Sequence, residues 1–360
     1  MARVEIRPWG LLETGQVVRM AILRNARGFE ARVSDYGATI VGIRAPDRDG
    51  RLGEVVLGFA DFADYVSPAY RLARPYFGAT IGRYANRIKG ARFTLDGPEH
   101  ALTPNEGGNQ LHGGPRGFDQ ALWTMEAVPD QNGVRFSLTS PDGDQGFPGT
   151  LRATVEMAVV DNEDSLILRY RATSDRPTHV NLTAHPYFNL DREAADTIRG
   201  HRLQVFADRF TPVDQQSVPT GMITGVADRP LDLREPSALG DVIDHLDMSE
   251  SRGLNHNYVL TLQPDGALRR AARLSEPRTG RCLDVWTTQP GLQVYSAGFL
   301  PTLAGRRGER FVREGGICLE TQHFPDTPNR PGFPTTRLDP ADAFVSQTQF
   351  RFHVDPRSPV

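Results

Sequence analysis

Hydrophobic and polar residues alternate along most of the chain, which is the pattern of β-strands whose two faces meet different surroundings. The alternation is clearest in five segments, which we predict to be strands: residues 18–22, 30–34, 91–95, 134–138 and 151–159. Asp-Gly and Asn-Gly pairs at 96–97 and 132–133 lie next to such segments and are typical of hairpin turns. Sustained helical periodicity is scarce, and residues 236–245 are the best helix candidate.

This pattern predicts an all-β protein, a large antiparallel β-sandwich with few short helices. The 35 glycines and 27 prolines are spread along the chain and form no linker, so we expect residues 1–360 to be a single domain. Two connections, residues 103–119 and 190–200, are long for hairpins. Long loops on a β scaffold are where binding residues usually lie.

Composition narrows the function classes further. The net charge of -3, with no block of like charge, does not favour a nucleic-acid partner. Residues 1–9 contain no apolar signal-peptide core, and no later run is long and apolar enough to cross a bilayer, so we expect a cytoplasmic protein without a membrane partner. Cys282 and Cys318 have no CxxC spacing, which argues against structural zinc and a disulfide framework. Lys89, the only lysine, lies in a surface-like turn, which makes Schiff-base chemistry an unfavoured alternative.

The segment 315–334 contains the most informative carboxylate. Alternation places Cys318, Glu320 and Gln322 on one face of a short apolar strand. Burial raises the pKa of a carboxylate towards the range in which a proton acceptor works near neutral pH. Glu320 is therefore either a general base or the partner of a buried arginine, and the proline-rich loop that follows it favours a site.

Two histidines add to this candidate site. A strand over residues 178–185 would place His179 and His185 on one polar face, although a lone histidine at a strand end is more often structural. His112 lies between glycines in the polar loop 105–119, where backbone and imidazole can closely approach a ligand.

Other chemistries find less support. Asn86 and Arg87 end a short strand-like run, and Arg87 is either a hydroxyl donor in a cleft or a member of an ion pair. The glycines before them lack the context of a phosphate-binding loop. A metal site would have to be assembled by the fold alone, because His112, His185 and Glu320 show no HxH or HExxH spacing. No GxSxG motif marks a serine nucleophile.

With these segments in view, the chain resembles the aldose 1-epimerase, or galactose mutarotase, family over nearly its whole length. The resemblance follows the family order through residues 35–50, 82–97, 109–119, 140–149, 181–190, 219–221, 287–296 and 320–334. Agreement at so many segments concerns the site as well as the fold.

The resemblance implies a galactose mutarotase-like β-sandwich (supersandwich) with an open sugar cleft, no cofactor and no metal. It implies that the chain interconverts the α and β anomers of free aldoses such as glucose and galactose, so its partner is a monosaccharide. It also implies roles for individual residues: Glu320 as general base, His185 as general acid, His112 as its partner on the ring oxygen, and Asn86, Arg87 and Gln289 as contacts to the sugar.

One position departs from the family pattern. The family usually has an aspartate that grips sugar hydroxyls before its late strand, where this chain has Asn255 in Gly253-Leu254-Asn255-His256. An amide keeps an acceptor but adds donors and loses the charge, so we expect either an altered sugar preference or a neutral variation.

Three alternatives stay open at this point: a non-catalytic sugar-binding or regulatory module of the same fold, a mutarotase for a pentose or a sugar phosphate, and a glycoside hydrolase. The hydrolase would need a second carboxylate, for which Asp326 is the nearest candidate. The sequence does not predict the oligomeric state.

Overall fold

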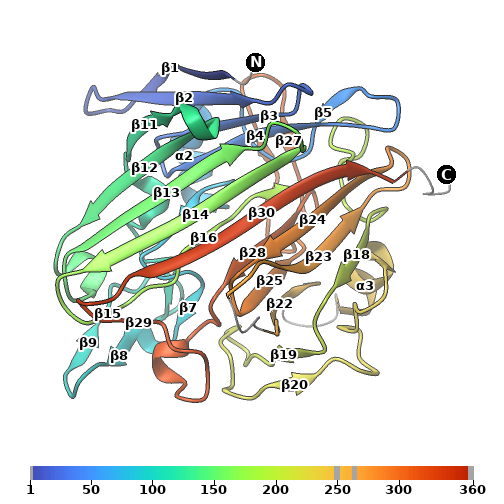
Figure 1. Cartoon of the computed structure of the whole chain (residues 1–360). Helices are drawn as coiled ribbons and strands as arrows, with labels where there is room; N and C mark the ends of the chain where they lie inside the picture. Colours follow the sequence, from blue (N-terminus) through green and yellow to red (C-terminus); the bar gives the residue numbers. More distant parts are fainter. Residues whose placement is uncertain (1–2, 247–251, 262–265, 356–360) are drawn as a thin grey trace.

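The computed structural model describes residues 3–246, 252–261 and 266–355, and its named strands all pair in the antiparallel sense (Figure 1). Three large sheets account for most of the strands, and five two-stranded sheets lie among the connections. The all-β sandwich predicted from alternation is confirmed.

The largest sheet has nine strands. In spatial order they are β11 (Thr124–Val128), β12 (Gly133–Ser140), β13 (Leu151–Val159), β14 (Ser165–Ser174), β30 (Phe344–Val354), β24 (Arg281–Thr287), β23 (Arg269–Ser275), β18 (Arg202–Val205) and β21 (Ser237–Ala238). The last strand of the chain therefore lies in the middle of this sheet, with Phe350 opposite Leu166 on one side and Val285 on the other. Figure 1 shows β30, in red, between β14 and β24.

Two smaller sheets complete the sandwich. The six-stranded sheet has the order β17 (Tyr187–Phe188), β28 (Ile317–Gln322), β25 (Gly291–Tyr295), β22 (Asn255–Val259), β19 (Arg209–Thr211) and β20 (Thr224–Gly225). The five-stranded sheet consists of β1 (Arg3–Leu11), β2 (Val17–Arg24), β3 (Glu30–Ser34), β4 (Thr39–Pro46) and β5 (Leu52–Glu54) in chain order.

The two-stranded sheets are formed by short strands within the connections between the large sheets. They pair β6 (Thr80–Ile81) with β16 (Thr183–Ala184), β7 (Arg87–Ile88) with β10 (Gln110–Leu111), β8 (Arg92–Thr94) with β9 (Glu99–Ala101), β15 (Thr178–His179) with β29 (Arg337–Leu338), and β26 (Leu303–Ala304) with β27 (Arg310–Phe311). The pair β6·β16 joins segments about a hundred residues apart in sequence, and the pair β7·β10 joins segments about twenty residues apart. Both pairs bring candidate site residues together.

The main core lies between the sheets. Leu319 of β28 and Val294 of β25 belong to the same apolar cluster as Val155 of β13 and Phe350 of β30. Residues of β28 alternate, so that Ile317 and Leu319 enter this core while Cys318, Glu320 and Gln322 face the other side. The inner face of the six-stranded sheet thus packs into the main core, and its outer face can carry polar groups.

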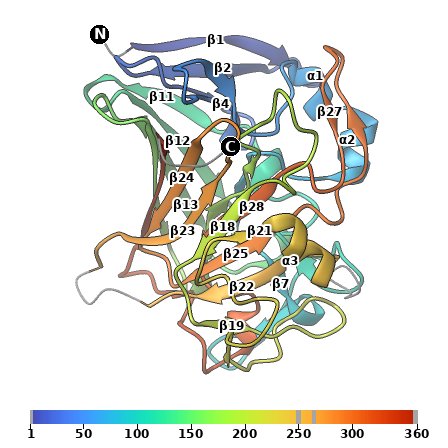
Figure 2. The ribbon, with the colours of Figure 1, turned by 90° about the vertical axis from the view of Figure 1, so that its right-hand side faces the viewer.

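Helices are short and few in the described residues: α1 (Phe62–Tyr65), α2 (Pro68–Ala73) and α3 (Leu239–Leu246). None has the length that crossing a bilayer requires. The helix predicted at residues 236–245 exists but begins later, because Ser237 and Ala238 pair with β18 as β21. Figure 2 shows α3 next to β21, which it contacts.

The predicted strands fare unevenly. Residues 18–22, 30–34, 134–138 and 151–159 all lie in strands, whereas only the middle of 91–95 does, as β8. The prediction of one strand over residues 178–185 is wrong. This segment forms β15 and β16 with irregular backbone between them, because each half pairs with a different partner strand.

Candidate active site

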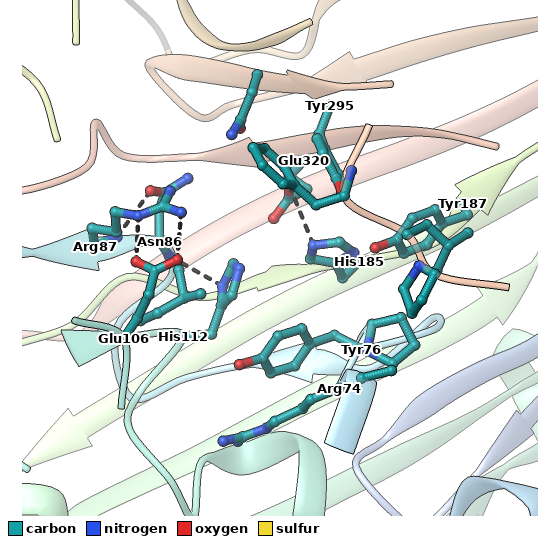
Figure 3. A pocket seen from close by; sticks show the side chains of 17 residues that line it. Arg74, Tyr76, Asn86, Arg87, Glu106, His112, His185, Tyr187, Tyr295 and Glu320 are labelled. Carbon is teal, nitrogen blue, oxygen red and sulfur yellow. Dashed lines mark hydrogen bonds and ion pairs between the residues drawn. The ribbon is translucent and has the colours of Figure 1, made fainter. Parts of the chain in front are cut away.

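Six of the seven candidate site residues, all except Gln289, meet in an open cavity of about 230 Å³ on the outer face of the six-stranded sheet. Its wall comes from β22, β25 and β28, from the loop after α2, and from the segments around Asn86, His112 and His185. Figure 3 shows these side chains gathered around a common space, with Glu320 and His185 on one side and Arg87 and His112 on the other.

Glu320 projects from β28, opposite Gln293 of β25. It is 2% exposed, and its Oε2 atom has no hydrogen-bond partner among the described residues. Burial raises the pKa of Glu320 to about 8, against the opposing charge of Arg87. The carboxyl group therefore holds a proton near neutral pH and becomes a base when that proton leaves.

His185 lies next to Glu320 in the wall of the cavity. Its Nε2 atom lies 3.6 Å from Glu320 Oε1, and its Nδ1 atom lies 3.4 Å from the Sγ of Cys318. Burial lowers the pKa of His185 to about 4, although a hydrogen bond to its own backbone carbonyl acts the other way. The two groups have pKa values displaced in opposite directions, as in pairs that divide acid and base roles.

His112 approaches the same space from the loop before β11. Its Nδ1 atom accepts a hydrogen bond from the Asn86 backbone N–H at 3.2 Å, so the neutral ring carries its proton on Nε2. Burial holds the pKa of His112 well below its usual range. The next residue, Gly113, has φ +82° and packs against the Gly82 carbonyl so closely that a Cβ atom could not fit. His112 is thus fixed as a neutral donor.

Asn86 and Arg87 follow one another on the cavity wall. Arg87 Nε and Nη2 donate to the two carboxylate oxygens of Glu106 at 2.6 and 2.7 Å, which locks the guanidinium in place. The Arg87 backbone N–H donates to Asn86 Oδ1, and Asn86 has a left-handed backbone with φ +64°. Such strained positions concentrate at functional sites.

Asn255 of β22 forms the remaining polar wall, and Gln293 of β25, which was not selected from the sequence, contacts it. Gln293 Nε2 donates to Asn255 Oδ1 at 2.8 Å, which leaves the Asn255 Nδ2 group as a donor on the cavity side. Gln289, selected from the sequence, is not brought to the cavity. It lies in the turn between β24 and β25, buried, and its side-chain amide has no partner in the described part of the chain. Alternation along β25, with Gln293 and Tyr295 on one face, is the signal that identifies Gln293.

Tyr76 packs against both histidines, and no pattern in the sequence predicts this contact. Its ring centroid lies 4.7 Å from that of His112 and 5.8 Å from that of His185. Like Asn86, it has a left-handed backbone, with φ +60°. Packing against this ring restricts the motion of both imidazoles.

His112, His185 and Glu320 together resemble a set of metal ligands. One ligand atom from each of His112, His185 and Glu320 lies within 4.8 Å of the others. The set fits a metal poorly, because Nδ1 of His112 is occupied by the Asn86 N–H and Nε2 therefore holds the proton. The arrangement is better suited to moving protons, since Glu320 and His185 can share one proton while His112 donates a fixed hydrogen bond.

Comparisons with known proteins agree with one another. The sequence pattern of the aldose 1-epimerase family matches residues 19–351. Galactose mutarotase of Homo sapiens is 42% identical over 323 residues, which cover 89% of this chain and 90% of that protein. Aldose 1-epimerase of Escherichia coli K12 is 39% identical over 345 residues, covering 95% and 97%. Among solved structures, a GalM/aldose epimerase homologue from C. elegans has a TM-score of 0.83 at 28% identity, covering 98% of this chain and 99% of that one.

Proposed function

The chain belongs to the aldose 1-epimerase family and is an aldose mutarotase, and from that premise we propose that Glu320, His185 and His112 interconvert the α and β anomers of its sugar. The observation that carries this assignment is the close pair of oppositely shifted groups, Glu320 and His185, at 3.6 Å in one cavity. Glucose and galactose are the sugars we propose first, since several relatives are galactose mutarotases.

The proposed reaction needs one proton on the pair. Ionised Glu320 takes the proton of the anomeric hydroxyl O1 while His185 Nε2 gives a proton to the ring oxygen, so the C1–O5 bond breaks and C1 becomes a carbonyl. Rotation about C1–C2 presents the other face of C1. Ring closure then returns the Glu320 proton to O1 and the O5 proton to His185, and the total proton count of the pair is unchanged.

The other residues bind and orient the sugar in this proposal. His112, as a fixed Nε2–H donor, hydrogen-bonds the ring oxygen and stabilises the negative charge that develops there. Arg87 and Asn86 hold hydroxyl groups at one end of the cavity, and Asn255 donates to a hydroxyl at the other, with its amide fixed by Gln293.

A panel of mutarotation rates tests this function. Freshly dissolved α-glucose, α-galactose and α-arabinose are followed by polarimetry, with and without EDTA. We expect a rate far above buffer for at least one sugar and no effect of EDTA. No acceleration for any sugar would favour the sugar-binding module, and loss of activity with EDTA would favour a metal site on the same three residues.

The pH dependence of kcat/KM should follow the protonation of the Glu320–His185 pair. Below the His185 pKa of about 4 both groups are protonated and no base is present, whereas above the Glu320 pKa of about 8 both are deprotonated and no acid is present. We therefore expect kcat/KM to be level between these values and to fall on both sides. The measurement is initial mutarotation rate at low sugar concentration from pH 3.5 to 9.5. A profile that rises steadily through pH 8 would contradict the assigned base.

Removing the Arg87 guanidinium should weaken binding more than turnover. Arg87→Ala deletes a charge-assisted donor to the sugar, so we expect KM to rise roughly ten- to a hundredfold with a smaller change in kcat. Arg92→Ala serves as the control, because the Arg92 side chain is 60% exposed and, within the described residues, forms an ion pair with the surface residue Glu99 alone. An unchanged KM in Arg87→Ala would remove this residue from the binding wall.

A further inference from the structure

Cys318 contacts His185, the proposed acid, and has no role in the proposed reaction. It precedes Glu320 by two residues on β28, so both side chains emerge on the outer face of the six-stranded sheet. Its backbone neighbours across the strands are Tyr187 of β17 and Tyr295 of β25. The thiol is completely buried among these groups.

The thiol contacts the edge of His185 that faces away from the sugar. Cys318 Sγ lies 3.4 Å from His185 Nδ1, and Tyr187, its partner on β17, belongs to the same buried cluster. The opposite edge of the ring, Nε2, faces Glu320 at 3.6 Å. The imidazole is therefore held at both nitrogens, by a thiol on one side and by the proposed base on the other.

The reaction restricts which nitrogen carries the permanent proton. If Nε2 gives its proton to the ring oxygen and later takes one back, it is bare in one of the two states. A neutral imidazole has one N–H, so in that state the proton must be on Nδ1. Nδ1 thus needs an acceptor throughout the cycle, and the structure places the sulfur there.

We propose that Cys318 is a positioning residue whose sulfur accepts the Nδ1–H of His185 and so leaves Nε2 as the nitrogen that exchanges a proton with the sugar. This inference rests on the proposed function, in which His185 is the acid. A thiol suits the task because it is a weak, neutral acceptor: a carboxylate at the same place would stabilise the imidazolium and make it a poorer proton donor.

The thiol itself takes no proton in this scheme. Burial, with the nearby charge of Glu320, raises the pKa of Cys318 well above its usual range, so the group stays a neutral thiol while His185 changes state.

The tautomer can be measured in the unaltered protein. Long-range ¹H–¹⁵N correlation spectra at pH 7 report which ring nitrogen is protonated, and the His185 signals are assigned by their loss in His185→Asn. We expect a protonated Nδ1 and a bare Nε2. A spectrum with the proton on Nε2 would overturn the proposal without any cysteine variant.

Two substitutions then test the sulfur, with the other cysteine as a matched control. Cys318→Ala removes the acceptor, so we expect kcat to fall about tenfold with KM little changed, together with a mixture of His185 tautomers. Cys318→Ser keeps an acceptor and should recover most of the loss. Cys282→Ala deletes the same atoms from a buried site on β24, outside the cavity, and should leave kcat and the tautomer as they are.

The outcomes separate this inference from the function on which it rests. Wild-type kcat and unchanged His185 shifts in Cys318→Ala, with His185→Asn inactive, would reject the role of Cys318 and leave the acid in place. A His185→Asn variant with full activity would instead reject the acid. If Cys318→Ala unfolds, the comparison of Cys318→Ser with the wild-type spectrum decides, since loss of the Nδ1–H tautomer there would also reject the proposal.

Discussion

Replacing Glu320 with glutamine is expected to lower kcat by roughly a thousandfold while changing KM only modestly, because general-base assistance is typically worth about a hundred- to ten-thousandfold. The amide has nearly the same shape and can still hydrogen-bond the sugar, but it cannot take the O1 proton at any pH. The exchange rate between α and β anomers, measured by saturation-transfer NMR at saturating sugar, gives kcat directly.

A matched control makes this result specific to the cavity. Glu314→Gln makes the same chemical change at another buried glutamate, which pairs with Arg199 at 3.0 Å outside the site. It should cost stability and leave the exchange rate close to that of the wild type. Near-wild-type turnover in Glu320→Gln would mean that another group, or solvent, removes the proton.

The second large effect is expected at His185. His185→Asn keeps a polar side chain of similar reach but has no group that can donate and recover a proton near neutral pH, so kcat should fall by about a hundred- to a thousandfold. The limb near pH 4 should disappear with it, since the imidazole is its source, and the residual rate should instead rise towards pH 8 as Glu320 loses its proton. Rates from pH 3.5 to 7 at saturating sugar measure both changes.

His179 is the control for His185. It is buried, its pKa is also lowered to about 4, and its Nδ1 atom meets Thr336 at 2.9 Å, away from the cavity. His179→Asn therefore repeats the loss of a buried neutral imidazole without touching the proposed chemistry. Equal losses in the two variants would attribute the effect to folding rather than to proton transfer.

Sequence alone predicted those site residues that are marked by their immediate neighbours in the chain. Alternation placed Glu320 on the polar face of its strand, and the glycines around His112 indicated a close backbone approach, because both features depend on neighbouring residues. The family resemblance supplied the roles. It did not distinguish Gln289 from Gln293, since that difference depends on which residue of β25 lies opposite Glu320 across the sheet.

What the sequence did not provide depends on contacts between distant segments. The Cys318 thiol behind His185 joins residues 133 positions apart, and no pattern within either segment predicts such a pair. The break in the segment 178–185 has the same origin, because β15 and β16 pair with β29 and β6. The single-domain organisation and the cytoplasmic location stay predictions.

The central position of β30 has a consequence for biosynthesis. Residues 344–354 pair with β14 on one side and β24 on the other, so the two halves of the nine-stranded sheet cannot join until β30 has left the ribosome. Until then both partner strands have open edges, the kind of surface that invites pairing with a second chain. The six-stranded sheet that carries the proposed site shares its core with this sheet, so that core is complete only after β30 has entered it.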